Sequence, residues 1–197
     1  MLRFNIVFFE NFETLDALGP AEVIGTLQEE YDLKFYSLQG GILQSKQRVA
    51  VDTLPLREID PSGVLLIPGG LGTRLVVNEE NFMGQLKVLA EKAAYVLTVC
   101  TGSALLAKTS LLNGKKATSN KVAFAWASSN GPEVEWVKKA RWVKDGKFYT
   151  SSGVSAGIDM TLGFVGDLHG LQKAQDIASY MEYVWNQDMD HDPFAIE

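Results

Sequence analysis

Cysteine, histidine and basic charge are all scarce in this sequence, and each scarcity excludes a class of function. The 197 residues include one cysteine, so no disulfide can form within the chain, and we expect a cytoplasmic protein. One cysteine and two distant histidines make no metal-ligand set, and no metal or other cofactor is expected. The net charge of −6 argues against a nucleic-acid partner, which would need a basic face. No apolar run approaches the roughly 18 residues of a membrane span, so no membrane partner is expected.

A single α/β domain is predicted over residues 1–197. Hydrophobic residues make up 46% of the chain, which is enough for one substantial core. Apolar strands that alternate with helices predict a parallel sheet covered on both faces. Strands are predicted at 2–9, 33–38, 64–67 and 93–99, with a small hairpin near 48–53 and a second hairpin at 141–143 and 147–150. Helices are predicted at 19–27, 79–92, 104–112, 121–128, 155–168 and 171–187.

The cysteine, Cys100, ends the predicted strand 93–99 and precedes a helical stretch. A strand that ends in a reactive side chain and turns at once into a helix is typical of a nucleophile elbow. We expect the turn to expose the sulfur and the start of the helix to lower the pKa of the thiol. The alternative is a structural thiol, because free cysteine is among the most buried residue types.

Two further segments follow predicted strands and should meet Cys100 at the carboxyl edge of the sheet: 10–16 and 68–74. The glycines of 68–74 lack the spacing of a phosphate loop, and we expect them to let a backbone N–H approach a substrate. Asp16 is the candidate proton carrier, because neither His169 nor His191 follows a strand. An acid beside a thiolate should have a raised pKa. The alternative for Asp16 is a helix-capping role.

Two other residues of these segments, Phe12 and Arg74, are candidates for the lining of a pocket, and surface-loop positions are the alternative. Glu22 lies six residues after Asp16 and is a second candidate for the acid. The four tryptophans are interpreted as core or interface residues rather than as a substrate cage.

Several motifs together resemble the ThiJ/PfpI superfamily over essentially the whole chain. They are Val99-Cys100-Thr101-Gly102-Ser103, Ile67-Pro68-Gly69-Gly70, Leu15-Asp16 with Gly19-Pro20-Ala21-Glu22-Val23, Gly114-Lys115-Lys116-Ala117-Thr118, and the segment 151–159. The resemblance implies a flavodoxin-like fold of the class I glutamine-amidotransferase type. It is much less specific to an activity than to the fold.

Within that superfamily the chain is most similar to the branch that contains isocyanide hydratase. The resemblance implies that Asp16, Cys100 and Thr101 are catalytic, that Gly70 and Thr101 supply backbone donors, and that the protein is a homodimer. Protease-like members have histidine directly after the cysteine, where this chain has Thr101. Many hydratase-like members have histidine after an Ala-Thr-Thr stretch, where this chain reads Ser119-Asn120. Secondary candidates for the site are Glu22, Gly69, Asn120 and Gly153.

The hypothesis that follows is a cysteine-dependent hydratase or hydrolase for a small-molecule substrate. In it, Cys100 attacks an electrophilic carbon and Asp16 transfers the proton. One alternative is a non-enzymatic redox sensor, because an exposed cysteine of low pKa beside a carboxyl oxidises readily. Another is a glyoxalase or deglycase activity, which superfamily membership allows and which the lack of a histidine partner disfavours. The substrate itself is not determined by the sequence.

Overall fold

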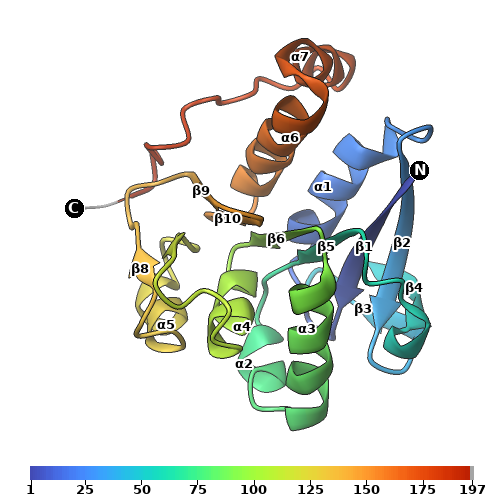
Figure 1. Cartoon of the computed structure of the whole chain (residues 1–197), viewed down its shortest axis with the longest axis vertical. Helices are drawn as coiled ribbons and strands as arrows, with labels where there is room; N and C mark the ends of the chain where they lie inside the picture. The colour runs from blue at the N-terminus through green and yellow to red at the C-terminus, as the bar shows by residue number, and fades with distance from the viewer. Residues whose placement is uncertain (196–197) are drawn as a thin grey trace.

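A computed structural model describes residues 1–195 of the chain (Figure 1). The strands are β1 (Leu2–Phe8), β2 (Tyr31–Ser37), β3 (Gly41–Gln44), β4 (Ala50–Pro55), β5 (Val64–Ile67), β6 (Tyr95–Val99), β7 (Lys116–Ala117), β8 (Glu135–Trp136), β9 (Trp142–Asp145) and β10 (Phe148–Ser151). The α-helices are α1 (Thr14–Gly25), α2 (Thr73–Val76), α3 (Glu80–Lys92), α4 (Gly102–Lys108), α5 (Phe124–Ser129), α6 (Ala156–His169) and α7 (Leu171–Tyr180). A short 3-10 helix, η1 (Leu56–Glu58), follows β4.

Eight of the strands form one sheet in the order β3-β4-β2-β1-β5-β6-β10-β9. All neighbours from β4 to β10 are parallel, and only the outermost pairs, β3 with β4 and β9 with β10, are antiparallel. Helices α1, α6 and α7 cover one face, and α2 to α5 cover the other (Figure 1). The predicted α/β fold, flavodoxin-like with a mostly parallel sheet, is therefore confirmed.

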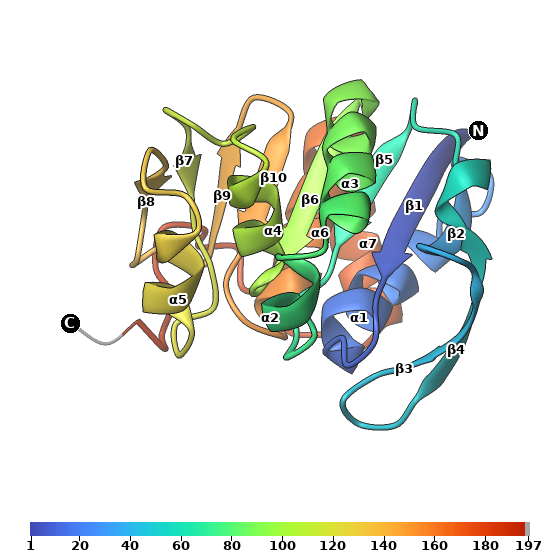
Figure 2. The same cartoon turned by 90° about the horizontal axis from the view of Figure 1, so that it is seen from below.

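The inner strands are apolar because helices cover both of their faces. Every residue of β5 is buried, and so are the last five residues of β1. Figure 2 shows β1, β5 and β6 side by side, with the β3–β4 hairpin projecting from the far end of the sheet. Both predicted hairpins are present, although the first spans β3 and β4 rather than only residues 48–53. Gly146 turns the second one with a φ of 60°. Strands β1, β5 and β6 end at one edge, which brings residues 9–13, 68–72 and Cys100 together.

Helix α1 begins at Thr14, five residues before the predicted start at Gly19-Pro20. The prediction placed Pro20 in the first turn, where its missing N–H costs nothing, but Pro20 lies inside the helix. Burial of Ala17 and Val23 against the core stabilises the helix despite the lost hydrogen bond. The consequence for function is that Asp16 belongs to the first turn of α1 and not to a loop.

Two predicted helices are too long. Helix α4 ends at Lys108 rather than at residue 112, because Ser110 has a φ of 68°, and α7 ends at Tyr180 rather than at 187, because Glu182 has a φ of 49°. Left-handed backbone interrupts a right-handed helix in both places.

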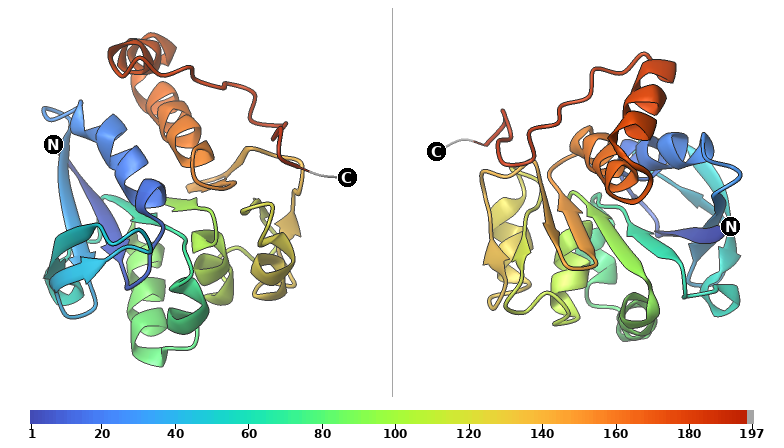
Figure 3. Two further views of the ribbon diagram at one scale, coloured as in Figure 1. Left: turned by 180° about the vertical axis from the view of Figure 1, so that it is seen from behind. Right: turned by 45° about the horizontal axis from the view of Figure 1, so that its top comes forward.

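After α7, residues 181–195 run back across the molecule to the edge strand β9 (Figure 3). The backbone N–H groups of Arg141 and Trp142 donate to the Met189 carbonyl at 2.8 and 3.3 Å. This segment therefore covers the start of β9. Among residues 1–195, no helix combines the length and the apolar character that a bilayer crossing needs. The cytoplasmic location stays a prediction.

Candidate active site

Cys100 occupies a sharp turn between β6 and α4, as the sequence predicts. Its φ is 57°, a left-handed backbone conformation that a residue other than glycine adopts only under constraint. Four hydrogen bonds impose that conformation. The Cys100 N–H donates to the carbonyls of Ser152 (2.9 Å) and Ser151 (3.2 Å), and the hydroxyls of Ser103 (3.0 Å) and Ser119 (2.9 Å) donate to its carbonyl. The backbone at the elbow is therefore fixed from both sides.

Asp16 is fully buried in the first turn of α1, and one of its carboxylate oxygens accepts a hydrogen bond from the Gly69 N–H at 2.9 Å. Burial raises the pKa of Asp16 to about 7, and the Gly69 hydrogen bond opposes that shift without cancelling it. The negative charge of Glu13 adds to the rise, while the Cys100 thiol opposes it. The other oxygen, Oδ1, forms no hydrogen bond of ordinary geometry among residues 1–195. A buried acceptor without a partner is costly, and here it is available to a proton or a ligand.

The Cys100 thiol is only 7% exposed, which corrects the prediction of an exposed sulfur of low pKa. Burial raises the pKa of the Cys100 thiol well above its ordinary value, and the nearby Asp16 carboxylate raises it further. The Thr101 N–H and hydroxyl lower the pKa, as expected for the start of a helix, but they do not compensate. Since α4 has only seven residues, its dipole is a weak counterweight to desolvation. Burial therefore favours the thiol over the thiolate at this position.

Gly69 brings these groups together because it has no side chain. A methyl group at this position would lie 2.6 Å from the Thr101 nitrogen, and 2.8 Å from both Asp16 Oδ2 and Cys100 Cβ. These distances are shorter than packed atoms allow, so only glycine lets α1 and the elbow approach each other across the loop. Gly69, a secondary candidate for the site, therefore packs against both Asp16 and Cys100.

Gly70 does not offer the free N–H that the resemblance implies. Its N–H donates to the Thr101 hydroxyl at 3.1 Å, so it is already engaged. The Thr73 hydroxyl lies 2.7 Å from the Gly70 carbonyl and 3.1 Å from the Thr101 hydroxyl. Thr101, which is buried, is thereby fixed by the glycine loop and by α2. In this structure the Gly70 backbone orients the Thr101 side chain.

Arg74 lies beside this network. Its guanidinium stacks on the Trp126 ring, 3.9 Å from the ring centroid, and donates to the Thr73 hydroxyl at 3.0 Å. The interpretation of Trp126 as a core or interface residue missed this contact, because α2 and α5 are far apart in the sequence. Phe12 is fully buried and packs edge-on against Phe8, so it is a core residue rather than a surface-loop residue.

Three candidates for the site remain: Glu22, which is wrong, and Asn120 and Gly153, which lie near the elbow. Glu22 is exposed, and six residues along a helix place it about 240° around the axis from Asp16. Glu22 is therefore not the acid of this site. Asn120 directly follows Ser119, which donates to the Cys100 carbonyl, and the Asn120 side chain packs against Gly153. No pattern in the sequence pointed to Ser119 itself, although its hydroxyl donates to the elbow carbonyl.

Both histidines lie away from Cys100. His169 bonds the Tyr31 hydroxyl at 2.8 Å, next to the start of β2 and hence at the opposite edge of the sheet. His191 pairs with Asp188 on an exposed part of the C-terminal segment. Within the described part of the chain, no three histidine, cysteine, aspartate or glutamate side chains are grouped as a metal site would require.

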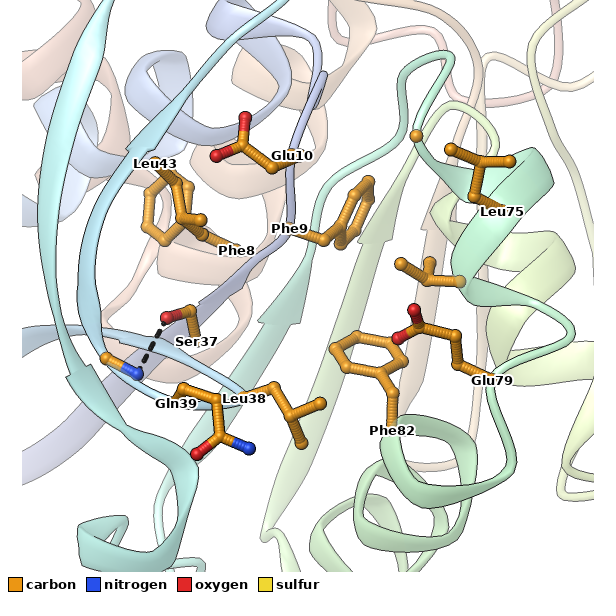
Figure 4. A pocket seen from close by; sticks show the side chains of 13 residues that line it. Phe8, Phe9, Glu10, Ser37, Leu38, Gln39, Leu43, Leu75, Glu79 and Phe82 are labelled. Carbon is orange, nitrogen blue, oxygen red and sulfur yellow. Dashed lines mark hydrogen bonds between the residues drawn. The ribbon is translucent and has the colours of Figure 1, made fainter.

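A separate apolar hollow of about 260 Å³ lies beside the end of β1 (Figure 4). Phe8, Phe9 and Phe82 line it, and Gly72 contributes to its wall. The glycine loop separates this hollow from Cys100, because Gly69 packs against the elbow while Gly72 packs against Phe9. Cys100 is not among the residues that line this hollow.

Comparison with known proteins identifies the family of this site. The model of the DJ-1/PfpI family matches residues 3–166. The isonitrile hydratase of Pseudomonas putida is 30% identical over 190 residues, which are 92% of this chain and 78% of that protein. A deglycase of Thermococcus kodakarensis is 28% identical over 149 residues, 74% of this chain and 87% of that protein.

Solved structures agree with the sequence comparison. A ThiJ/PfpI family protein of Pseudomonas syringae superposes with a TM-score of 0.81 and 26% identity, over 98% of this chain and 77% of that one. DJ-1beta of Drosophila melanogaster superposes with a TM-score of 0.79 and 21% identity, over 93% of this chain and 99% of that one, and shows the same fold. Asp16, the glycine loop and Cys100 all lie within the matched residues 3–166, and the chain is a member of the DJ-1/PfpI family.

Proposed function

We propose that this chain hydrates a small molecule at an electrophilic carbon, that an isocyanide is the favoured substrate class, and that Cys100 is the nucleophile. The observation that carries the proposal is the thiol of Cys100 beside the buried carboxyl of Asp16, both packed on Gly69. A pKa of about 7 suits a group that must both accept and donate a proton near neutral pH. The similarity to an isonitrile hydratase over 92% of the chain supports the choice of substrate.

The first half of the reaction attaches the substrate. The Asp16 carboxylate takes the thiol proton as the Cys100 sulfur bonds to the terminal carbon of the isocyanide, R–N≡C. The protonated Asp16 then gives that proton to the same carbon. The product is a thioimidate, R–N=CH–S, bonded to Cys100. A raised thiol pKa is compatible with this step, since the proton moves to an acid that packs against the same glycine as Cys100.

The second half releases the product. The Asp16 carboxylate accepts a proton from water as the water oxygen bonds to the thioimidate carbon, and it passes that proton to the nitrogen. The remaining hydroxyl proton then returns to the Asp16–Cys100 pair as the C–S bond breaks. The formamide R–NH–CHO then leaves. Over the whole reaction, one water molecule supplies its oxygen and two of its hydrogens. The Thr101 hydroxyl, fixed by Gly70 and Thr73, orients the intermediate.

We also propose that the working form is a homodimer. Leu15 lies next to Asp16 and is 44% exposed, and Leu71 and Leu75 in and after the glycine loop are 56% and 68% exposed. A second copy covering these side chains would bury apolar surface and exclude water from the thiol. The molar mass in solution, measured by light scattering, tests this point: twice the chain mass of 21.6 kDa is expected.

The two alternatives are separated by chemistry. The raised thiol pKa counts against a redox sensor, because sensing cysteines oxidise as accessible thiolates. The similarity to a deglycase supports activity on carbonyl compounds as the second candidate. In such a reaction the same thiol would attack a carbonyl carbon.

The test is a turnover assay of the full chain with neutral alkyl and aryl isocyanides, with formamide measured by chromatography. We expect catalytic formamide formation by the unaltered protein and none by Cys100→Ala. The same protein is offered an α-oxoaldehyde in parallel. Turnover of the aldehyde without turnover of any isocyanide would replace the first candidate by the second, and full activity of Cys100→Ala would remove both.

A further inference from the structure

Arg74 is held more firmly than an ordinary surface arginine. Its guanidinium stacks on Trp126 of α5, and Nη1 donates to the Thr73 hydroxyl at 3.0 Å and to the Gly70 carbonyl at 3.4 Å. Stacking on an aromatic face and hydrogen bonding restrict a side chain that otherwise has many rotamers. The glycine loop and the start of α2, which are consecutive in the sequence, and the distant helix α5 thus fix one cation in place.

This cation lacks a counter-ion. Within one copy of residues 1–195, no carboxylate forms an ion pair with Arg74, and the hydrogen bonds of its guanidinium all come from Nη1, which leaves Nε and Nη2 without a partner. The side chain is half-buried, and desolvation lowers the pKa of Arg74 from its ordinary value. A partly buried charge without a partner is unfavourable unless a ligand supplies the opposite charge. Two forked N–H donors are therefore free to bind an anion.

The guanidinium also lies next to the candidate nucleophile. Nη1 bonds the Thr73 hydroxyl, which lies 3.1 Å from the Thr101 hydroxyl, and Thr101 directly follows Cys100. A group bound by Arg74 would therefore be within one small molecule's length of the sulfur.

We propose that Arg74 and Trp126 form an anion subsite beside Cys100, which binds a carboxylate carried by the substrate. The proposal rests on the proposed function in one respect, that Cys100 attacks the substrate, and it narrows the substrate class to small anionic electrophiles. The chain as a whole has a net charge of −6 and repels anions, so a fixed local cation is needed to bind one. The planar guanidinium matches a carboxylate with two parallel hydrogen bonds.

The other role open to Arg74 is stabilisation of the Cys100 thiolate. Burial and the Asp16 carboxylate keep the pKa of that thiol well above its ordinary value even with Arg74 in place. An arginine placed to ionise the thiol would bond the sulfur, whereas Arg74 bonds the Thr73 hydroxyl and the Gly70 carbonyl. The two roles differ in a measurable way, because a thiolate stabiliser speeds every electrophile and an anion subsite speeds only anionic ones.

The experiment compares the alkylation of Cys100 by iodoacetate and by iodoacetamide, followed by mass spectrometry. The two reagents differ in one carboxylate, and Cys100 is the only cysteine, so each rate reports one site. We expect Arg74→Gln to slow iodoacetate about tenfold or more, the effect of losing one charge-assisted contact of ~1.4 kcal/mol, while the iodoacetamide rate stays within about twofold. Trp126→Leu, which frees the guanidinium, should reduce the iodoacetate rate by a smaller factor.

Arg57→Gln is the matched control. It removes the same charge from exposed η1, after β4, and three strands separate β4 from β6 in the sheet. Neither alkylation rate should change in this control. Equal slowing of both reagents by Arg74→Gln would overturn the subsite and assign Arg74 to the thiol, and no change in either rate would overturn it as well. If Arg57→Gln also slowed iodoacetate relative to iodoacetamide, the preference would come from the overall charge of the protein and not from a subsite at Arg74.

Turnover then separates the subsite from the proposed function. Isocyanoacetate and its neutral ethyl ester are compared as substrates of the unaltered protein and of Arg74→Gln. We expect the variant to lose at least tenfold in kcat/KM for isocyanoacetate alone, by the same ~1.4 kcal/mol. A protein that prefers iodoacetate but hydrates neither compound would keep the subsite and lose the hydratase proposal. One that hydrates both equally and treats both alkylating reagents alike would keep the hydratase and lose the subsite.

Discussion

Two buried aspartates in this molecule have opposite surroundings. Asp159 on α6 is bound by Arg141, whose Nε donates to one oxygen at 2.7 Å, while the Tyr183 hydroxyl and the Asn186 N–H donate to the other at 3.0 and 3.1 Å. Among residues 1–195, Asp16 accepts one hydrogen bond of ordinary geometry, from the Gly69 N–H, and no cation lies beside it. Burial raises the pKa of both groups, but at Asp159 the charge and hydrogen bond of Arg141 oppose the rise, and so do two further donors, Asn186 and Tyr183.

The difference separates a structural charge from a reactive one. The Asp159 cluster also includes Asp192, which pairs with Arg141 at 3.6 Å and so attaches the C-terminal segment to the body of the protein. Both carboxylate oxygens of Asp159 have donors, so the cluster holds its geometry. Asp16 keeps an unfilled oxygen and a pKa near neutral pH, which leaves it free to exchange a proton. Substitutions at Asp16 and in the Asp159 cluster should therefore have different effects on activity and stability.

The largest effect is expected from Asp16→Asn on activity. An amide can still accept the Gly69 hydrogen bond, but it cannot take the thiol proton or return it to the substrate. We expect kcat/KM for isocyanide hydration to fall by about 10²- to 10⁴-fold. The assay is formamide formation, with circular dichroism to show that the fold is unchanged. A loss of less than about tenfold would assign the proton transfer to another group.

The second effect concerns stability and belongs to the other aspartate. Arg141→Met leaves Asp159 buried without its cation, and we expect the free energy of unfolding to fall by about 3–5 kcal/mol. Urea denaturation measures it. Lys144→Met, on strand β9 just after Arg141, is the control. The Lys144 and Asp167 side chains are each about two-fifths exposed, and such an ion pair is worth less than about 1 kcal/mol. Equal effects of the two substitutions would show that the Arg141 pair is not a structural charge.

The third effect is a gain in stability from Asp16→Asn that depends on pH. Below pH ~4 the carboxyl is protonated in both the folded and the unfolded chain, so its charge costs nothing. Between pH ~4 and about 7 the unfolded chain loses this proton first, so stability falls as the pH rises, and above about 7 the full penalty remains. Three pKa units correspond to ~4 kcal/mol, an upper limit for the advantage of the variant at pH 8 over pH 4. Thermal unfolding at several pH values measures it, and a pH-independent difference would contradict the raised pKa.

The sequence predicted the architecture because its signals were local and periodic. Strand β5 is a continuous apolar run, and the strand–Cys100–helix pattern required only adjacent residues. The pairing of Asp16 with Cys100 followed from a topological rule, since both come after parallel strands. Residues that contribute through contacts between distant segments had no such signal, as with the stacking of Arg74 on Trp126 and the hydroxyl of Ser119 on the elbow carbonyl.

The pKa of the thiol was predicted in the wrong direction for a related reason. The start of a helix is visible in a sequence and lowers a thiol pKa, but the burial that raises it depends on packing by α1 and the glycine loop. Desolvation of a buried group outweighs the dipole of a short helix. The prediction of Glu22 as a possible acid was wrong because the helix was predicted to begin at residue 19. With Asp16 placed in a loop, the sequence could not show that Asp16 and Glu22 lie on different faces of α1.

The smallest effect is a shift in the pH dependence of Cys100 alkylation. The Asp16 carboxylate raises the pKa of the thiol, so Asp16→Asn should move the midpoint of the iodoacetamide rate profile to lower pH. Asp159→Asn, which changes a buried acid outside the site, should leave that midpoint in place. A shift to higher pH in Asp16→Asn would mean that Asp16 favours the thiolate. The acid would then act before substrate arrives, rather than by receiving the proton as the carbon–sulfur bond forms.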